Sequence, residues 1–220
     1  MKEKLKQFKA NFLNFGIPKY RLQKSKNKAR KKYKELNGDD NITILSPNCI
    51  GGEIYNLLGL KFNSPLINSS MKRVDFIDFC LNLDEYLKIK PKVLSMKKGH
   101  PILTLESPKL KRIDINFIHD DNQDTVINNW EKRKKRIIKD KIYVIMDNKD
   151  EHGNSIDEKI IKKIEEFNSK KKIIFVTHNN KLKDGYEIGE KQIKRYNFKK
   201  ISGLYGFQYF FDYVDFLTKK

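Results

Sequence analysis

Three clusters of polar side chains in this sequence each follow a short apolar run, and each contains a group able to act as a nucleophile, an acid or a base. If the apolar runs are parallel strands of one α/β sheet, the clusters lie at the same edge, where such sheets bind their ligands. The spacing therefore predicts one chemical site built from three strand ends. The clusters are Ser46–Cys49 after residues 42–45, Asp147–Asn148 after residues 142–146, and Thr177–His178 after residues 173–176.

Cys49 is the candidate nucleophile of this site. It stands between a predicted strand end and Gly51-Gly52, which open a helix predicted over residues 52–58. The amino end of a helix lowers the pKa of a thiol from about 8.5, and its free N–H groups can bind an oxyanion or a phosphate. We therefore expect Asn48, Gly51 and Gly52 to contact the substrate, the glycines by allowing close approach to the backbone. The alternative interpretation is a small buried side chain, which is common for cysteine.

Histidine and aspartate side chains supply the candidate bases. His178 and His119 each follow a predicted strand, and either could take a proton from Cys49 or from a sugar hydroxyl. Asp147 could supply the carboxylate that orients the imidazole. Asp120 is a further candidate, as a substrate contact or as a base. The alternative is that each histidine is an ordinary loop residue.

Two further groups of residues could hold a phosphate or a sugar. Arg133 and Arg136 belong to a basic run on a predicted helix and could face a phosphate-bearing donor, although a solvated helix face is the alternative. Asn63 and Ser64 could hydrogen-bond a sugar near Cys49, or could simply form a turn. The sequence has no spaced set of ligands typical of a metal site, so we expect no metal.

Apolar strands separated by amphipathic helices predict the fold class. The pattern indicates an α/β protein with a three-layer, Rossmann-like arrangement, in which helices flank a largely parallel central sheet. We expect a basic helical arm over residues 1–40 and a single α/β domain over residues 41–220. Strands are predicted at 42–45, 93–94, 102–105, 113–118, 142–146 and 173–176, and helices at 52–58, 74–87, 124–139, 156–167 and 207–217.

The 220 residues carry a formal net charge of +19, and the basic residues concentrate at the amino end. Residues 1–34 contain thirteen Lys and Arg side chains against the single acid Glu3, with apolar residues among them at helical spacing. Such a basic amphipathic segment is typical of contact with an anionic membrane surface. A solvated helix in a lysine-rich protein is the alternative. Nucleic-acid binding ranks last, because the basic residues mostly flank the predicted core.

The composition also bears on the cellular compartment. Two cysteines do not make a disulfide framework, and they fit a reducing cytosol. No apolar run approaches the roughly 20 residues of a transmembrane helix, and the amino end lacks the apolar region of a signal peptide. The sequence therefore predicts a cytoplasmic protein, held peripherally on the inner face of the membrane if the arm binds lipid.

The polar clusters and the segments between them resemble a known family. In order and spacing they are similar to the bacterial exopolysaccharide-biosynthesis family catalogued as domain of unknown function 1919, over about residues 40–180. That family commonly has Asn where Pro47 stands and an aromatic residue where Ile50 stands. The resemblance implies a role in building capsule, exopolysaccharide or another surface glycan, without an established reaction. The segments are Ser46–Gly52, Leu58–Pro65, Asp75–Ile77, His119, Trp130–Ile137, Tyr143–Met146 and Phe175–His178.

Three functions are compatible with these residues and this resemblance. The first, which we favour from the sequence, is acyl transfer to a sugar hydroxyl, as in an O-acetyltransferase, with Cys49 and a histidine at the strand ends and coenzyme A as acyl donor. The second is glycosyl transfer from a nucleotide-sugar to a glycan or lipid-linked sugar acceptor, with Asp147 or Asp120 as base. The third is a basic adaptor without catalysis that binds a membrane or a glycan.

Overall fold

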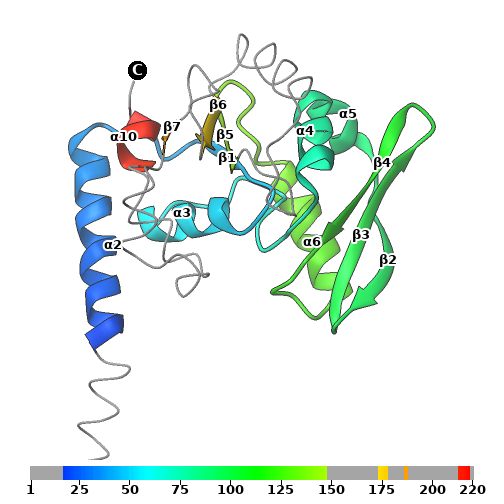
Figure 1. The fold of residues 1–220 in the computed structure, drawn as a ribbon, viewed down its shortest axis with the longest axis horizontal. Helices are drawn as coiled ribbons and strands as arrows, with labels where there is room; N and C mark the ends of the chain where they lie inside the picture. Colours follow the sequence, from blue (N-terminus) through cyan, green and yellow to red (C-terminus); the bar gives the residue numbers. More distant parts are fainter. Residues whose placement is uncertain (1–16, 148–172, 178–185, 188–212, 219–220) are drawn as a thin grey trace, which may run out of the picture.

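The computed structural model describes residues 17–147, 173–177, 186–187 and 213–218, which form a mixed α/β fold with two sheets (Figure 1). The parallel sheet has the strand order β1-β5-β6-β7, and the antiparallel sheet has the order β2-β3-β4. The strands are β1 (Thr43–Leu45), β2 (Lys92–Lys97), β3 (His100–Ser107), β4 (Leu110–Asn116), β5 (Ile142–Asp147), β6 (Ile173–Thr177) and β7 (Tyr186–Glu187). The helices are α2 (Ile17–Glu35), α3 (Ile50–Leu58), α4 (Arg73–Leu81), α5 (Leu83–Lys88), α6 (Gln123–Lys134) and α10 (Tyr213–Thr218).

The three apolar runs predicted as parallel strands do pair in parallel. β1 pairs with β5, with Leu45 opposite Val144, and β5 pairs with β6, with Asp147 opposite Val176. Because neighbouring strands run in the same direction, the carboxyl ends of β1, β5 and β6 lie at one edge of the sheet.

Both faces of the β1–β5 pair are buried, which explains why β5 reads as an unbroken apolar run. Leu45 and Val144 face a core that includes α4, α5, α6 and the antiparallel sheet. Ile44 and Ile145 face a second core, made with α2, α3 and α10. Because successive side chains of a strand point to opposite faces, α3 packs on one face of β1, and α4 and α6 pack on the other.

Helices pack against the parallel sheet as expected, but on one side a second sheet is also present, which the sequence did not predict as a separate layer. There, the antiparallel sheet β2-β3-β4 covers α6 and α4, and its inward face packs Leu103 and Ile115 into the first core (Figure 1). A tight turn at Lys98 and Gly99 joins β2 to β3, and both residues have positive φ, of 52° and 82°. Such two-residue turns match the twist of a hairpin, so this region folds as a local meander instead of a crossover unit.

The helix predicted over residues 74–87 is two helices, α4 and α5. The break is at Asn82, whose backbone leaves the helical region (φ −116°, ψ 33°). The Asn82 side-chain amide donates to the carbonyl of Asp78 at 3.2 Å, and its own carbonyl accepts the N–H of Glu85 at 3.0 Å. Asn82 thus ends one helix and opens the next, a role that its short polar side chain favours.

The basic amino-terminal helix α2 packs on the α/β body. Arg30 donates from Nε and Nη2 to the carbonyls of Leu57 and Asn56, both at 3.0 Å, at the carboxyl end of α3. These carbonyls have no partner within the helix, so a guanidinium there satisfies them. Tyr33 is buried in the second core and donates its hydroxyl to the carbonyl of Asp39 at 2.6 Å.

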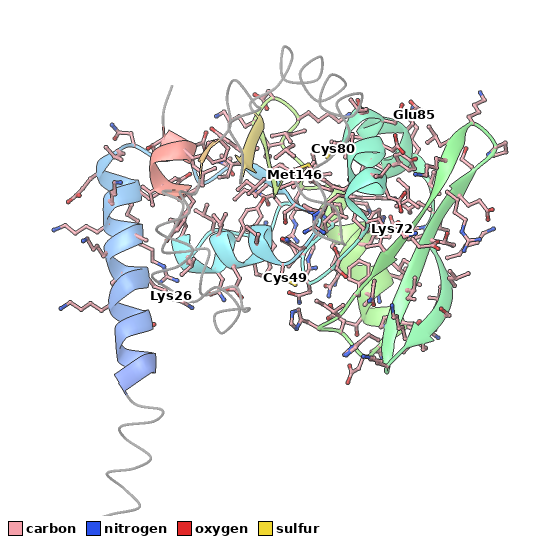
Figure 2. The ribbon with its side chains drawn as sticks, viewed as in Figure 1. Lys26, Cys49, Lys72, Cys80, Glu85 and Met146 are labelled. Atoms are coloured by element: carbon pink, nitrogen blue, oxygen red, sulfur yellow. The ribbon has the colours of Figure 1, made fainter. Side chains whose placement is uncertain are left out.

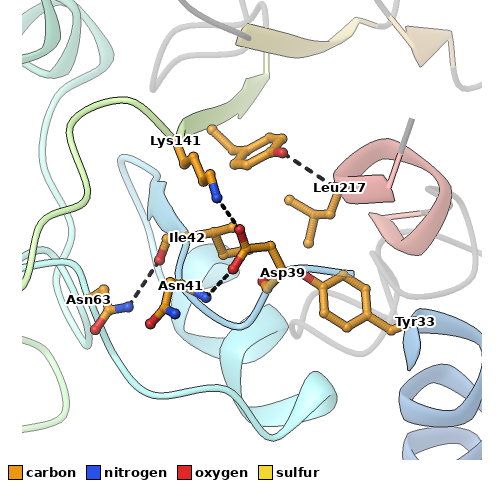
Figure 3. Close-up of polar contacts among 8 residues, drawn as sticks. Tyr33, Asp39, Asn41, Ile42, Asn63, Lys141 and Leu217 are labelled. Carbon is orange, nitrogen blue, oxygen red and sulfur yellow. Dashed lines mark hydrogen bonds and ion pairs between the residues drawn. The ribbon is translucent and has the colours of Figure 1, made fainter. Parts of the chain in front are cut away.

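A polar network ties the loop after α2 to the far end of the chain (Figure 3). Lys141, just before β5, forms an ion pair with Asp39, which also accepts the N–H of Asn41 at 2.7 Å. Tyr143 of β5 donates its hydroxyl to the carbonyl of Leu217 in α10 at 3.3 Å. The helix predicted over 156–167 and the first part of that predicted over 207–217 lie outside the described residues.

Candidate functional site

The turn between β1 and α3 is held by its own side chains. Ser46 Oγ accepts the N–H of Gly51 at 2.9 Å and donates to the carbonyl of Asn48 at 2.7 Å. The side-chain oxygen of Asn48 accepts the N–H of Ile50 at 3.0 Å. Two amino-terminal N–H groups of α3 therefore already have acceptors. Of the helix N–H groups expected to be free for an oxyanion, those of Ile50 and Gly51 are therefore occupied by Asn48 and Ser46.

The two glycines leave space for protein side chains. A Cβ at Gly51 would lie 2.8 Å from Ser46 Oγ, which is closer than real contacts allow. A Cβ at Gly52 would lie 3.4 Å from a methyl group of Ile67, an ordinary contact distance. The expectation that both glycines clear room for a ligand is therefore wrong for Gly51, where the hydroxyl of Ser46 fills the space.

Cys49 caps the amino end of α3 and is buried, with 8% of its surface exposed (Figure 2). Its Sγ lies 4.0 Å from the carbonyl oxygen of Ser69, to which the thiol donates. Burial, with a smaller contribution from the charge of Glu53, raises the pKa of the thiol from its ordinary 9.0 to about 11. The expected lowering of this pKa is wrong, because desolvation of a thiolate outweighs the effect of the helix end.

Of the predicted bases whose side chains the structure describes, neither His119 nor Asp120 forms a hydrogen bond with Cys49. His119 is exposed in the loop that follows β4. Asp120, next to it, is half-buried and its carbonyl oxygen accepts a hydrogen bond from His100 Nδ1 at 2.9 Å. Asp147 is the last residue of β5, at the carboxyl edge of the parallel sheet, and His178 lies outside the described residues.

Asn63 and Ser64 are buried and have structural partners. The side-chain nitrogen of Asn63 donates to the carbonyl of Ile42 at 3.2 Å, beside the start of β1 (Figure 3). Ser64 Oγ accepts the N–H of Leu66 at 3.3 Å, which closes a local turn. Asn63 is 4% exposed and Ser64 is 1% exposed, so in this arrangement neither reaches a sugar. The turn interpretation of this pair is the one that the geometry supports.

Arg133 is buried although it belongs to a basic run. It is 9% exposed, donates from Nη1 to the carbonyl of Ile67 at 3.4 Å, and places its guanidinium 5.6 Å from the ring centre of Phe62. Burial lowers the pKa of Arg133, the charge of Asp120 raises it, and the charge of Arg136 lowers it further. Arg136 is half-buried, and its Nε is fully buried without a hydrogen-bond partner. The alternative of a solvated helix face is therefore wrong for Arg133.

One segment, residues 62–71, connects these features. The carbonyl of Ser69 accepts the hydrogen bond from the thiol of Cys49. The side chain of Ile67 lies against Gly52, and its carbonyl accepts a hydrogen bond from Arg133. The N–H of Met71 donates to the carbonyl of Pro47 at 3.0 Å. The segment therefore runs from the arginines to the carboxyl end of β1. Its contacts are mostly through backbone carbonyls, which no residue pattern in the sequence marks.

Three residues of this region were missed as organisers of the site: Ser46, Phe62 and Ile67. Ser46 has a visible signal, because a serine at a strand end five residues before a helical glycine can accept that glycine's N–H. Phe62 and Ile67 read as ordinary apolar residues. No group of three or more His, Cys, Asp or Glu that could hold a metal ion occurs among the described residues. Within the same residues, no helix has the length and apolar character needed to cross a membrane.

Comparison with known proteins assigns the chain to a family. The family model described as domain of unknown function (DUF1919) matches residues 19–218. A protein of Haemophilus influenzae (strain ATCC 51907 / DSM 11121 / KW20 / Rd), described as an uncharacterized protein, is 30% identical over 179 residues, which are 79% of this chain and 82% of that protein. The match includes the β1–α3 turn, the segment 62–71 and both arginines. The chain belongs to the DUF1919 family.

Proposed function

We propose that this protein is a glycosyltransferase that builds a surface polysaccharide, with its reaction centre at the carboxyl edge of the parallel sheet. The observation that carries the proposal is the register of that sheet, which brings the end of β1 and Asp147 of β5 to one edge. Open α/β sheets bind their ligands outside this edge. The link to a surface polysaccharide rests on the resemblance of the sequence segments described above.

Glycosyl transfer is favoured over acyl transfer by the state of Cys49. A covalent acyl-cysteine route needs a thiolate and a base within hydrogen-bond reach. The thiol is buried, its pKa is raised to about 11, and its hydrogen bond goes to the carbonyl of Ser69. Direct transfer from a nucleotide-sugar needs no protein nucleophile, so it is compatible with a structural Cys49.

In the proposed reaction, a hydroxyl oxygen of the acceptor attacks the anomeric carbon of the donor sugar. The bond from that carbon to the phosphate oxygen breaks, and the nucleoside diphosphate leaves with the electron pair. We assign to Asp147 the role of the base that takes the hydroxyl proton, because its strand ends at the reactive edge. We further propose that the whole sheet has the three-layer, Rossmann-like arrangement in which nucleotides bind at such an edge.

Mass spectrometry of the surface glycan from cells that produce Asp147→Asn tests this function. We expect the glycan to lose a whole sugar residue from its repeat, because the amide cannot accept the proton. Asp140→Asn is the matched control, since Asp140 is exposed and lies just before β5, at the opposite end of the same strand. A glycan that is unchanged in Asp147→Asn, with protein levels equal to the wild type, would refute the proposal.

We also propose that α2 holds the enzyme at an anionic membrane surface, where a lipid-linked acceptor would be available. Lys24, Lys28 and Lys31 are exposed and follow one another at spacings of four and three residues, so they line one side of the helix. Arg30 and Tyr33 face the body on the other side. Electrostatic attraction to anionic lipid contributes roughly 1 kcal/mol for each lysine near the surface.

Co-sedimentation with vesicles containing phosphatidylserine tests this attachment. The triple change of Lys24, Lys28 and Lys31 to Gln is expected to lower binding by roughly two orders of magnitude. Lys92 and Lys97 of β2 and Lys109 of the turn between β3 and β4 are exposed at the other end of the molecule, so their change to Gln removes the same charge as a control (Figure 1). Equal loss in both triple variants would show that net charge, and not α2, determines binding.

A further inference from the structure

Arg133 and Arg136 are two cations that lack a carboxylate partner among the described residues. Lys134, which lies between them in sequence, does have such a partner, since it pairs with Glu131 at 2.8 Å. The charge of Asp120 acts on Arg133 from a distance, and the described residues show no ion pair between the two side chains. Burying a guanidinium without an opposite charge is unfavourable, so these two side chains favour an anionic partner.

The two arginines differ in how their donors are satisfied. Arg133 is nine-tenths buried, and its Nη1 donates to the carbonyl of Ile67 at a long 3.4 Å. The Nε of Arg136 is inaccessible to solvent and has no acceptor. A backbone hydrogen bond of 3.0 Å from the N–H of Arg136 to the carbonyl of Arg133 holds the two residues on one turn at the end of α6.

The surroundings fix the position of these donors before any ligand arrives. The guanidinium of Arg133 lies over the ring of Phe62, and Phe62 packs edge-on against Tyr55 at a centroid distance of 5.8 Å. Tyr55 in turn holds β1, because its hydroxyl accepts the N–H of Ile44 at 2.8 Å and donates to the carbonyl of Ile42 at 3.1 Å. A cation anchored in this way loses little freedom when it binds an anion.

We propose that Arg133 and Arg136 form a binding site for a phosphate group, which in the proposed glycosyl transfer is the diphosphate of the donor. Guanidinium groups present planar N–H donors that match the oxygens of a phosphate. The site adjoins the reaction edge, because Ile67, the partner of Arg133, is two residues from Ser69, the partner of Cys49. Those two residues span at most about 7 Å of chain. The identity of the phosphate carrier rests on the proposed function, whereas the site itself does not.

Calorimetric titration of the full-length protein with pyrophosphate at constant ionic strength tests this site. Arg136→Gln is expected to weaken binding at least tenfold, because it removes the buried, unpaired Nε donor. Lys135→Gln is the matched control, because Lys135 is exposed and lies between the two arginines in sequence. This change removes the same positive charge as Arg136→Gln. Its affinity is expected to equal that of the wild type. Equal affinity in Arg136→Gln and Lys135→Gln, or no heat of binding for the wild type, would overturn the proposal.

Arg133→Lys provides a second variant that keeps the charge in place. A lysine cannot present the planar set of donors, so we expect Arg133→Lys to bind pyrophosphate more weakly than the wild type does. Repeating the titrations in sulfate buffer of the same ionic strength should leave the order of the variants' pyrophosphate affinities unchanged. Circular dichroism and thermal unfolding of each variant verify the fold. If pyrophosphate fails to bind but Asp147→Asn still removes a sugar, the phosphate site is wrong and the glycosyltransferase proposal stands. If pyrophosphate binds but the glycan is unchanged in Asp147→Asn, the phosphate site stands and the glycosyltransferase proposal is wrong.

Discussion

Gly51 and Gly52 are adjacent in sequence, yet the structure predicts opposite responses to the same added methyl group. In Gly51→Ala the new Cβ would lie 2.8 Å from Ser46 Oγ and 3.5 Å from a methyl carbon and the carbonyl oxygen of Ile44. Ser46 must then move, which breaks its hydrogen bonds to Gly51 and Asn48. In Gly52→Ala the new Cβ meets a methyl group of Ile67 at an ordinary 3.4 Å.

The size of the effect follows from three contributions. Loss of the Ser46 cap costs about 0.5–2 kcal/mol, and crowding of the turn costs about 1–3 kcal/mol. Replacing a helical glycine by alanine stabilises the helix by up to about 1 kcal/mol, which offsets part of this loss. We therefore expect Gly51→Ala to be destabilised by about 2 kcal/mol, which lowers Tm by about 4–8 °C for a chain of this size. Gly52→Ala is expected to match or slightly exceed the wild type.

Urea and thermal unfolding of the two variants measure this difference. The double variant Ser46→Ala with Gly51→Ala is a further test, because removing the hydroxyl removes the clash and the two changes become non-additive. If Gly51→Ala is as stable as the wild type and instead loses only glycan synthesis, Gly51 serves the ligand and the structural explanation of this turn is refuted.

Two further predictions concern titratable groups. Burial raises the pKa of Cys49 to about 11, so little thiolate is present at pH 8. We therefore expect iodoacetamide at pH 8 to alkylate Cys49 on the order of a hundredfold more slowly in the folded protein than in urea, as followed by peptide mass spectrometry. Equal rates would contradict the burial. Lys141 lowers the pKa of Asp39 below its ordinary 3.8, so the stability that this carboxylate contributes is present above that value and is lost as the pH falls through the folded-state pKa. Asp39→Asn should therefore be less stable than the wild type at pH 7 and equal to it in strong acid, and a difference that does not change with pH would contradict the pairing.

The parallel strands were predictable because burial on both faces leaves an unbroken apolar signature. Residues 142–146 carry it over five positions, and the structure places them in β5 between β1 and β6. The antiparallel sheet was recognised as strands but not as a separate layer. The hairpin that begins this layer depends on the positive φ of Lys98 and Gly99. Lysine is not typical of such a turn, so the sequence did not predict it.

The position of the Ser46–Cys49 cluster was predictable, but its contacts were not. The cluster Ser46–Cys49 does follow a strand and does open a helix. The thiol nevertheless points to the carbonyl of Ser69, twenty residues away in sequence, and this contact depends on the path of residues 62–71. The partners of Asn63 and Arg133 are also backbone carbonyls, which every residue has, so no side-chain pattern could have identified them.

The most direct test of the proposed chemistry is the mass of the surface glycan from cells that produce Cys49→Ala in place of the wild-type protein. We expect a glycan of unchanged mass, because a buried thiol that only donates to Ser69 takes no part in glycosyl transfer. Loss of an acyl group from an otherwise intact sugar backbone would contradict this, and would make Cys49 the nucleophile of an acyltransferase.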